Sequence, residues 1–275
     1  ELLYNVKRLW APGNRTPLLK MKKIIKKLIN SLGYDISRKP DEREIKILSF
    51  DEIYKLQMKK NPVIFDIGAN RGQSIERFLK TFDYPTIHAF EPNKEEFDKL
   101  KTRFSLKKNI ILNNLAIGDK KENKEFYLTS HSGNSSFIDL NPNTKWINIR
   151  SKQARVNREN YIKRREKVNI NTIDNYLILN NINHIDLIKI DTQLYEDKVL
   201  MGCENTIKNQ KVDAIEMEIA FSDAYKKYFS FSDLEKYLIP YNFRFSAIRL
   251  NNNNLFSGSI FFADILYLNK NKFNI

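Results

Sequence analysis

The sequence predicts an α/β protein with a parallel β-sheet and helices on both of its faces. Short, apolar, β-branched segments such as Val63–Phe65 have the composition of buried parallel strands. Apolar residues recur between them at helical spacing, for example over residues 75–82. Strand and helix patterns alternate in this way as far as about residue 220, as a parallel sheet covered by helices requires.

Size and composition narrow the class of protein. The 275 residues suffice for one large domain with an extension, and 41% hydrophobic residues argue against disorder. No apolar run of about 18 residues predicts a transmembrane helix, and the start shows no signal-peptide pattern. The only cysteine, Cys203, lies on an apolar helix face, so we expect it to pack in the core of a cytoplasmic protein. His88, His131 and His184 are far apart in the sequence, and no zinc site is predicted.

The amino-terminal part is predicted to be separate from the main domain. Residues 1–40 contain ten Lys or Arg and two acids, so they carry +8 of the formal charge of +14. Residues 21–32 place apolar side chains on one helix face and lysines on the other. We expect residues 1–45 to form a leader and a basic amphipathic helix, and residues 46–275 to form the main domain. The helix either packs on that domain or, through residues 18–32, contacts the inner face of a membrane. Met21 is a candidate start of translation.

The turn after the first strand indicates the class of ligand. In a dinucleotide-binding G-x-G-x-x-G loop, the three glycine positions would here be Asp66, Gly68 and Arg71. A carboxylate beside a pyrophosphate would be repelled. An acid at this position suits a ligand with a cationic or hydroxyl-rich end, such as S-adenosylmethionine.

A second acid supports a nucleoside site. The strand at residues 86–90 ends at Glu91, and Pro92 and Asn93 lead into a helix. An acid at the end of the second strand is where a βαβ nucleotide fold holds ribose hydroxyls. The sequence therefore predicts an α/β fold that binds adenosine, although Glu91 could also be a solvated charge at the end of a strand.

Further elements follow along the chain. Residues 109–119 indicate a third strand and a turn, the polar loop 129–136 is expected at the surface, and residues 168–173 alternate like a strand. A buried strand ends at Asp191 and is followed by one helix with Val199, Leu200, Cys203 and Ile207 inward. The chain closes with a strand at 212–220, a helix, and an antiparallel pair at 243–250 and 259–268.

Several segments together resemble the FkbM family of S-adenosylmethionine-dependent methyltransferases. In order, they are VIFDIGANRGQS, HAFEPNKEEFDKLK, NNLAIGD, Ser135–Ser136, TIDNYL and IDLIKIDTQLYEDKVLMG. The resemblance spans about residues 60–270. It implies a class I methyltransferase (Rossmann-like) sheet of seven strands, mostly parallel with one antiparallel strand. It also implies methyl transfer to oxygen, commonly a hydroxyl of a sugar or polyketide, often in surface-polysaccharide pathways.

The resemblance also implies roles for individual residues. Around the cofactor it places Asp66, Gly68, Asn70, Gly72, Gln73, Glu91, Pro92 and Ala116. The chain departs from the family at Leu194, where a glycine is usual, and this side chain is expected to narrow the space beside Asp191.

Asp191 is the first candidate for a general base, because the strand that it ends should lie next to the first strand. His131 is the second candidate, and Glu218 is a candidate partner of Asp191. A general base typically contributes about 10²–10⁴-fold. Alternatively, Asp191 and Glu218 could hold a divalent metal that orients the hydroxyl. The plainer alternatives are that Asp191 caps the following helix, that His131 is an ordinary loop residue, and that Glu216 and Glu218 face solvent.

Two rival functions stay open. The excess of basic over acidic residues, together with the arginine-rich residues 150–167, would suit an RNA methyltransferase. Against this, the strand ends in Asp191-Thr-Gln-Leu, whereas enzymes that methylate the amino group of a flipped base have an [N/D]-P-P-[Y/F] motif there. We therefore expect a small-molecule or glycan acceptor rather than nucleic acid. The other rival is a non-catalytic scaffold that keeps the fold and tethers polysaccharide enzymes to a membrane.

Overall fold

The computed structural model describes residues 47–221, 223–250 and 260–273, together with Ile25, Lys27, Ile29 and Ser31, which are helical. The predicted leader and most of the basic helix at residues 21–32 lie outside the described residues. The chain divides into two compact units, residues 1–47 and 48–275. Among the described residues, no helix has the length and apolar composition that crossing a bilayer requires.

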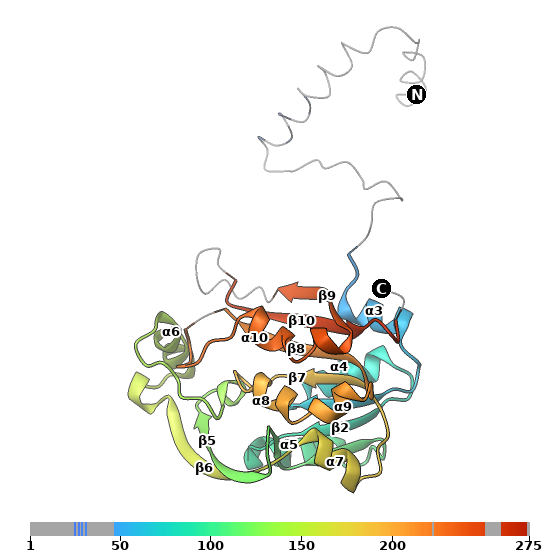
Figure 1. Ribbon diagram of the computed structural model, residues 1–275. Coiled ribbons are helices and arrows are strands. Elements are labelled where there is room, and N and C mark those ends of the chain that lie inside the picture. Colours follow the sequence, from blue (N-terminus) through green and yellow to red (C-terminus); the bar gives the residue numbers. More distant parts are fainter. Residues whose placement is uncertain are drawn as a thin grey trace. The chain divides into compact units, whose positions relative to one another are not determined.

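A seven-stranded sheet forms the centre of the second unit (Figure 1), in the order β3-β2-β1-β7-β8-β10-β9. The first five strands in this order are parallel, and β10 runs antiparallel to both of its neighbours. This confirms the predicted sheet, including the antiparallel strand near the edge. The strands are β1 (Val63–Ile67), β2 (Thr86–Phe90), β3 (Ile110–Asn113), β7 (Ile185–Ile190), β8 (Val212–Ala220), β9 (Phe243–Leu250) and β10 (Phe262–Asn269).

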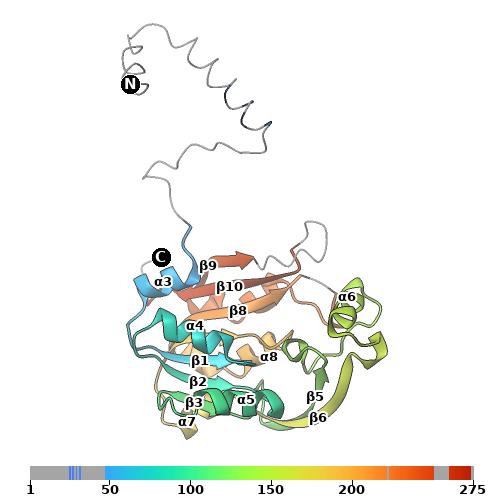
Figure 2. The same cartoon turned by 180° about the vertical axis from the view of Figure 1, so that it is seen from behind.

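Helices cover both faces of this sheet, as predicted (Figures 1 and 2). One face carries α3 (Phe50–Gln57), α4 (Gln73–Thr81) and α5 (Lys94–Phe104), and the other carries α7 (Ile173–Leu179), α8 (Glu196–Met201), α9 (Glu204–Lys208) and α10 (Phe231–Glu235). The expectation of a single helix after Asp191 is wrong, because α8 ends before Gly202 and a separate helix, α9, begins after Cys203. A Cβ on Gly202 would lie 1.9 Å from the carbonyl oxygen of Gly118, so the chain passes too close there for a side chain. Cys203 is buried in the core, which confirms its predicted role.

A second, three-stranded sheet lies beside the first and was not foreseen. Its order is β4-β6-β5, with β4 (Ala116–Ile117), β5 (Glu122–Thr129) and β6 (Ile162–Asn171). The predicted third strand at 109–119 is therefore two short strands in different sheets. The strand expected at 168–173 begins earlier, because β6 pairs with β5 along its whole length. Between β5 and β6 in the chain lie α6 (Lys145–Ala154) and the 3₁₀ turns Ser132–Asn134 and Arg158–Asn160. A further 3₁₀ turn, Ile239–Tyr241, precedes β9.

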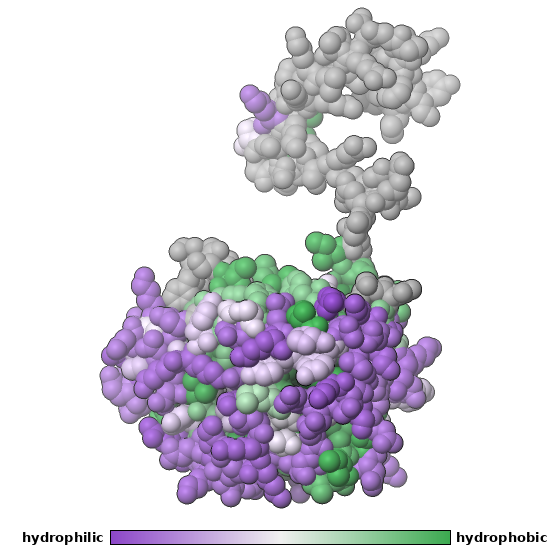
Figure 3. Space-filling model, in the orientation of Figure 1, coloured by the Kyte–Doolittle hydropathy of each residue, from purple (hydrophilic) through white to green (hydrophobic). Residues whose placement is uncertain are grey.

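Strand β9 is the outer edge of the large sheet. Its side chains Phe245, Ile248 and Leu250 are each more than 40% exposed. Figure 3 shows apolar surface along this edge, whereas the helices of the same view are mostly covered by hydrophilic side chains. Apolar side chains are also exposed elsewhere, for example Ile178 and Leu179 of α7.

Candidate active site

A cavity of about 310 Å³ lies at the carboxyl ends of β1, β2 and β7. Strand β1 pairs with β2 on one side and with β7 on the other, so the chain order reverses here as predicted. Ligands of open α/β sheets bind at such a switch point, and typical sites have volumes of about 300–1,000 Å³. Six of the expected cofactor-binding residues line the cavity: Gly68, Asn70, Gln73, Glu91, Pro92 and Ala116.

The turn after β1 depends on its two glycines. Gly68 has φ +85°, and a Cβ there would lie 1.9 Å from the carbonyl oxygen of Asp191. Gly72 has φ +84° and begins α4, and its Cβ would lie 2.5 Å from the ring of Phe104. Both positions therefore require glycine, for conformation and for space. Gly72 does not line the cavity, so its predicted cofactor contact is replaced by a role in holding the turn.

Asp66 lies behind the wall of the cavity rather than in it. Its carboxylate is fully buried, and Oδ2 accepts a hydrogen bond from the Ser74 hydroxyl at 2.5 Å. The other oxygen, Oδ1, is buried without a hydrogen-bond partner. Burial raises the pKa of Asp66, although Lys189 and Ser74 oppose this shift. Ser74 and Lys189 line the cavity themselves, so Asp66 acts on the site through them.

Glu91 connects the first two strand ends. Its Oε2 accepts a hydrogen bond from the Asn70 N–H at 2.8 Å, and its Oε1 accepts one from the Asn93 N–H at 2.7 Å. Each oxygen keeps a second lone pair, which can accept a hydroxyl. The side chain is 5% exposed, and burial raises its pKa to about 7 against these two hydrogen bonds. Glu91 is therefore a buried acceptor in the cavity wall and not a solvated charge.

Asp191 is the centre of a side-chain network on the other side of the cavity. Its Oδ2 is 2.9 Å from Lys189 Nζ, and its Oδ1 accepts a hydrogen bond from Gln193 Nε2 at 3.0 Å. Burial alone would lower the pKa of Lys189, but the carboxylates of Asp191 and Asp66 outweigh it and raise this pKa. Asp191 does not cap α8, whose amino end has no side-chain cap. Its carboxylate is held by side chains at the cavity.

Gln193 joins Asp191 to Glu218. The same Nε2 donates to Glu218 Oε2 at 2.7 Å, and Gln193 Oε1 accepts a hydrogen bond from the Tyr225 hydroxyl at 2.9 Å. The expected partnership of Asp191 and Glu218 is thus indirect, through an amide. Burial, together with Asp191 and Asp264, raises the pKa of Glu218 well above its usual range.

Glu216, on the same strand as Glu218, has a different environment. It is fully buried and pairs with Arg77 Nη2 at 2.5 Å and with Arg249 Nη2 at 3.2 Å. Burial opposes these cations, but they lower the pKa of Glu216. The alternative that both acids face solvent on an outer strand is wrong for Glu216, which is fully buried, and β8 lies between β7 and β10; Glu218 is partly buried.

The loop 129–136 forms one wall of the site. Thr129, Asn134, Ser135 and Ser136 are buried, so the expectation of a surface loop is wrong for these residues. The Ser136 hydroxyl donates to the carbonyl oxygen of Gln193 at 2.6 Å, which fixes the loop against the network.

His131, in the same loop, lines the large cavity. Burial lowers its pKa, and the nearby guanidinium groups of Arg150 and Arg71 lower it further. A neutral imidazole at this place can accept a proton.

A second cavity, of about 170 Å³, adjoins the first. Both cavities are lined by Gly133, Asp191 and Gln193. The smaller one is otherwise lined by Asn134, Arg150, Glu218, Phe261 and Phe262. A group in the large cavity and a group in the small one can therefore meet beside Asp191.

Sequence reasoning missed three residues of this site: Lys189, Gln193 and Arg150. Lys189 had a visible signal, because it is the one cation in the apolar run of residues 187–190. Gln193 and Arg150 had none, since their contacts depend on the path of distant segments.

The model of the Methyltransferase FkbM domain matches residues 66–245, well over half of the chain. The chain belongs to the FkbM methyltransferase family. This confirms the resemblance seen in the sequence motifs.

Named relatives of this FkbM chain are distant. The 2-O-methyltransferase NoeI of Sinorhizobium fredii is 25% identical over 158 residues, which are 57% of this chain and 63% of that protein. A methyltransferase FkbM from Methylobacillus flagellatus is 13% identical, with a TM-score of 0.49, over 76% of this chain and 44% of the other. A TehB-like SAM-dependent methyltransferase from Corynebacterium glutamicum is 10% identical, with a TM-score of 0.40, over 93% of this chain and all of the other. The fold assignment therefore comes from the strand order of the FkbM chain itself.

The FkbM family implies S-adenosylmethionine as cofactor, and the large cavity fits it. Because Gly68 has no side chain, backbone atoms form the cavity wall beside Asp191. Behind this wall, the buried Oδ1 of Asp66 has no hydrogen-bond partner and adds negative potential. Glu91 has free lone pairs for two hydroxyls. Phe90, Ile117 and Phe126 supply an apolar surface for a base. The donors and acceptors thus suit a cationic nucleoside.

Leu194 does not narrow the site as expected. Its side chain is buried in the core cluster of the α7–α10 face and lines neither cavity. The family's glycine is explained by the backbone, because Leu194 has φ +68° and Gln193 has φ +56°. Two successive residues in the left-handed region store strain, of order 1–3 kcal/mol each, and such strain clusters at functional sites.

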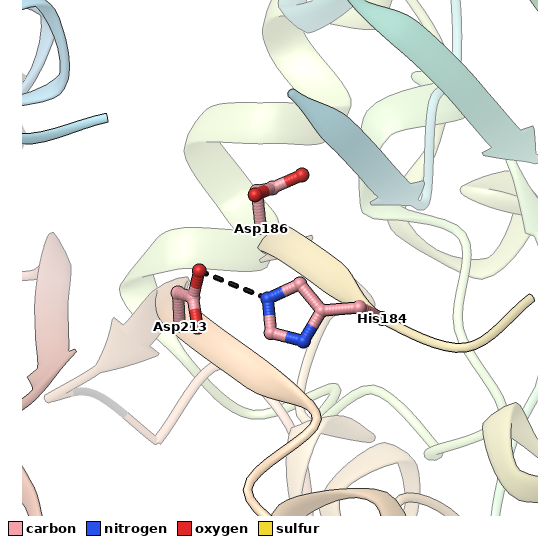
Figure 4. Close-up of side chains that lie close together, drawn as sticks. All are labelled: His184, Asp186 and Asp213. Carbon is pink, nitrogen blue, oxygen red and sulfur yellow. Dashed lines mark ion pairs between the residues drawn. The ribbon is translucent and has the colours of Figure 1, made fainter. Parts of the chain in front are cut away.

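One group of potential metal ligands exists among the described residues, far from the cavities. His184, Asp186 and Asp213 lie at the amino ends of β7 and β8, with ligand atoms within 4.8 Å of one another. Figure 4 shows His184 and Asp213 pointing toward each other, and their Nε2 and Oδ2 atoms are 2.9 Å apart. Asp186 Oδ2 already accepts a hydrogen bond from the Val63 N–H and pairs with Lys59 at 3.0 Å. The cluster is therefore explained as hydrogen bonds and ion pairs that fix the strand ends.

Proposed function

We propose that this FkbM-family chain methylates a hydroxyl group of a sugar in a surface polysaccharide or related glycan, with S-adenosylmethionine as methyl donor. The observation that carries the proposal is the meeting of the two cavities at Gly133, Asp191 and Gln193. The large cavity suits the cofactor, and the small one leaves space for an acceptor. The name of the relative NoeI, a 2-O-methyltransferase, supports oxygen as the methylated atom.

Asp191 is the proposed general base. S-adenosylmethionine, when bound, supplies a methyl group made electrophilic by a sulfonium. The acceptor oxygen would take this methyl group as the sulfur–methyl bond breaks and S-adenosylhomocysteine leaves as a neutral thioether. The hydroxyl proton would pass to an oxygen of Asp191. The carboxylate is held by Lys189 at 2.9 Å and Gln193 at 3.0 Å, so its orientation is fixed before the acceptor arrives. Fixed alignment of reacting groups can be worth about 7–11 kcal/mol.

Glu218 is proposed to act through Gln193. Burial, Asp191 and Asp264 raise the pKa of Glu218 well above its usual range, which favours the protonated form over a second negative charge beside Asp191. Its Oε2 accepts from Gln193 Nε2 and so sets the orientation of that amide. Glu218 is thus a positioning residue rather than a metal ligand or a base.

His131 is the alternative base. Its lowered pKa keeps the ring neutral, but it lines only the large cavity, whereas Asp191 lines both. This difference favours Asp191.

The test compares Asp191→Asn and His131→Gln with the unchanged protein. We expect Asp191→Asn to lower turnover by about 10²–10⁴-fold at unchanged cofactor affinity, and His131→Gln to have the smaller effect. Unchanged turnover in Asp191→Asn would remove it from the chemistry.

The acceptor class needs a separate experiment. Radiolabelled methyl transfer to extracted cell-surface glycan and its precursors should label the glycan fraction. Label in RNA, with steeply salt-dependent binding, would instead support the RNA methyltransferase. No heat on titration with S-adenosylmethionine would favour the scaffold. Membrane contact through residues 18–32 is tested by flotation of the full chain with anionic vesicles.

A further inference from the structure

The small cavity contains a guanidinium that no carboxylate of the described residues neutralises. Arg150 lines it from α6, which lies beyond the carboxyl end of β8 (Figures 1 and 2). In the described part of the chain, no Asp or Glu oxygen comes within the 4.0 Å of an ion pair with Arg150. Its single hydrogen bond there is from Nη1 to Gln153 Oε1, at 3.0 Å. Most of the five N–H donors of this side chain therefore have no acceptor within the described protein.

The surroundings hold Arg150 in place without neutralising it. Its guanidinium lies 5.8 Å from the ring centre of Trp146, which is fully buried. Its Nε is buried and has no hydrogen-bond partner. A buried donor without an acceptor is costly, so a ligand that supplies acceptors there gains affinity.

The other charges of the cavity do not cancel Arg150. Asp191 is already paired with Lys189 at 2.9 Å. Burial, Asp191 and Asp264 raise the pKa of Glu218 well above its usual range, and its Oε2 is already bonded to Gln193 Nε2 at 2.7 Å. Neither carboxylate that lines the small cavity forms an ion pair with Arg150, so its guanidinium is left unpaired on the wall next to Asp191.

We propose that Arg150 binds an oxyanion carried by the acceptor itself, so that the methylated sugar is an acidic one. Carboxylate and phosphate share the chemistry that Arg150 would recognise, because a planar guanidinium fork matches both with two parallel hydrogen bonds. The aromatic side chains of Phe261 and Phe262 line the same cavity and can pack against the apolar face of a sugar ring. This inference rests on the proposed function and names its substrate class.

The test measures binding of three probes by saturation-transfer NMR, with and without S-adenosylhomocysteine. The probes are D-glucuronate, D-glucose 1-phosphate and the neutral methyl glucoside. We expect at least one anionic probe to bind about tenfold or more tightly than the neutral one, as charge-assisted hydrogen bonds predict. The comparison of glucuronate with the phosphate distinguishes the two sources of the anion.

Variants assign this preference to Arg150. Arg150→Gln should abolish it, and Arg150→Lys, which keeps the charge but not the fork, should retain part of it. Lys152→Gln is the matched control, since Lys152 is exposed on the same helix and lines neither cavity. It should bind the probes as the unchanged protein does.

The proposal is overturned if no anionic probe binds more tightly than the neutral one, which includes no binding at all. It is also overturned if Arg150→Gln keeps the preference. If Arg150→Gln does not fold, Arg150→Lys takes its place in the test. The proposal is then overturned if Arg150→Lys prefers the anionic probes as strongly as Lys152→Gln does. Binding of S-adenosylmethionine is measured in a separate titration. If the unchanged protein does not bind it, the proposed function is contradicted, whereas the three probes still test the role of Arg150.

Discussion

The two halves of the site are built by different means. The cofactor half, from Val63 to Glu91, relies on backbone: two glycines with positive φ and one acid that accepts two N–H groups. The acceptor half relies on side chains from distant segments, joined through Gln193 and bounded by Arg150. The comparison teaches that the cofactor half is encoded locally, whereas the acceptor half depends on how the whole chain folds.

The largest effect is expected for Gly68→Ala, which attacks the local half. The added Cβ would lie 1.9 Å from the Asp191 carbonyl oxygen, and φ +85° is strained for alanine. The turn must shift, so we expect loss of measurable cofactor binding by calorimetry and a lower Tm. Lys80→Ala is the control, because Lys80 is exposed on α4 and lines neither cavity. If Gly68→Ala and Lys80→Ala bind S-adenosylmethionine equally, the backbone turn is not what forms the cofactor half.

The same contrast explains what the sequence could predict. The α/β fold and the nucleoside site at Glu91 were predicted from one short pattern of strand, glycine turn, helix and acid. The seven-stranded sheet and the six cavity-lining residues were implied by the resemblance to the FkbM family. Asp66 and Gly72 were expected around the cofactor, but neither lines the cavity, and their contacts with Ser74 and Phe104 depend on residues that the pattern does not specify.

The acceptor half could be predicted only in part. Asp191 ends a buried strand and was visible for that reason, but Gln193 and Arg150 have meaning only once residues 129–161 fold over the sheet. The polar composition of the loop 129–136 predicted a surface position, but Ser136, whose hydroxyl donates to the Gln193 carbonyl oxygen, is buried.

An intermediate effect is expected for pH, which acts on the cofactor half through Glu91. Its pKa is raised to about 7, and the carboxylate is the form that accepts ribose hydroxyls. Cofactor affinity should therefore fall about tenfold between pH 8 and pH 6, the change that a pKa of about 7 implies. Calorimetry at several pH values measures this, and a flat profile would contradict the role of Glu91.

The stability of the free protein should respond in the opposite sense. A folded-state pKa above the unfolded value means that the native state takes up a proton as pH falls. The contribution of Glu91 to stability is thus present below its unfolded pKa and is lost as pH rises through 7. Urea unfolding of the free protein should show a smaller loss of stability with rising pH in Glu91→Gln than in the unchanged chain.

The smallest effect is expected from metal removal, which probes the acceptor half. The amide of Gln193 lies between Asp191 Oδ1 and Glu218 Oε2, where a shared cation would have to bind. Methyl transfer should therefore be unchanged by EDTA. Loss of activity with EDTA that added magnesium or manganese restores would show that Gln193 moves aside for a metal.

The central claim is that the cavity beside Glu91 binds S-adenosylmethionine, and calorimetric titration at pH 8 tests it most directly. The unchanged chain should bind one equivalent, and Glu91→Gln should bind it about tenfold or more weakly, because Gln replaces an acceptor by a donor. Glu95→Gln, an exposed neighbour paired with Arg164, should bind as the unchanged chain does. Equal affinity in all three proteins, or no binding by the unchanged chain, would contradict the account.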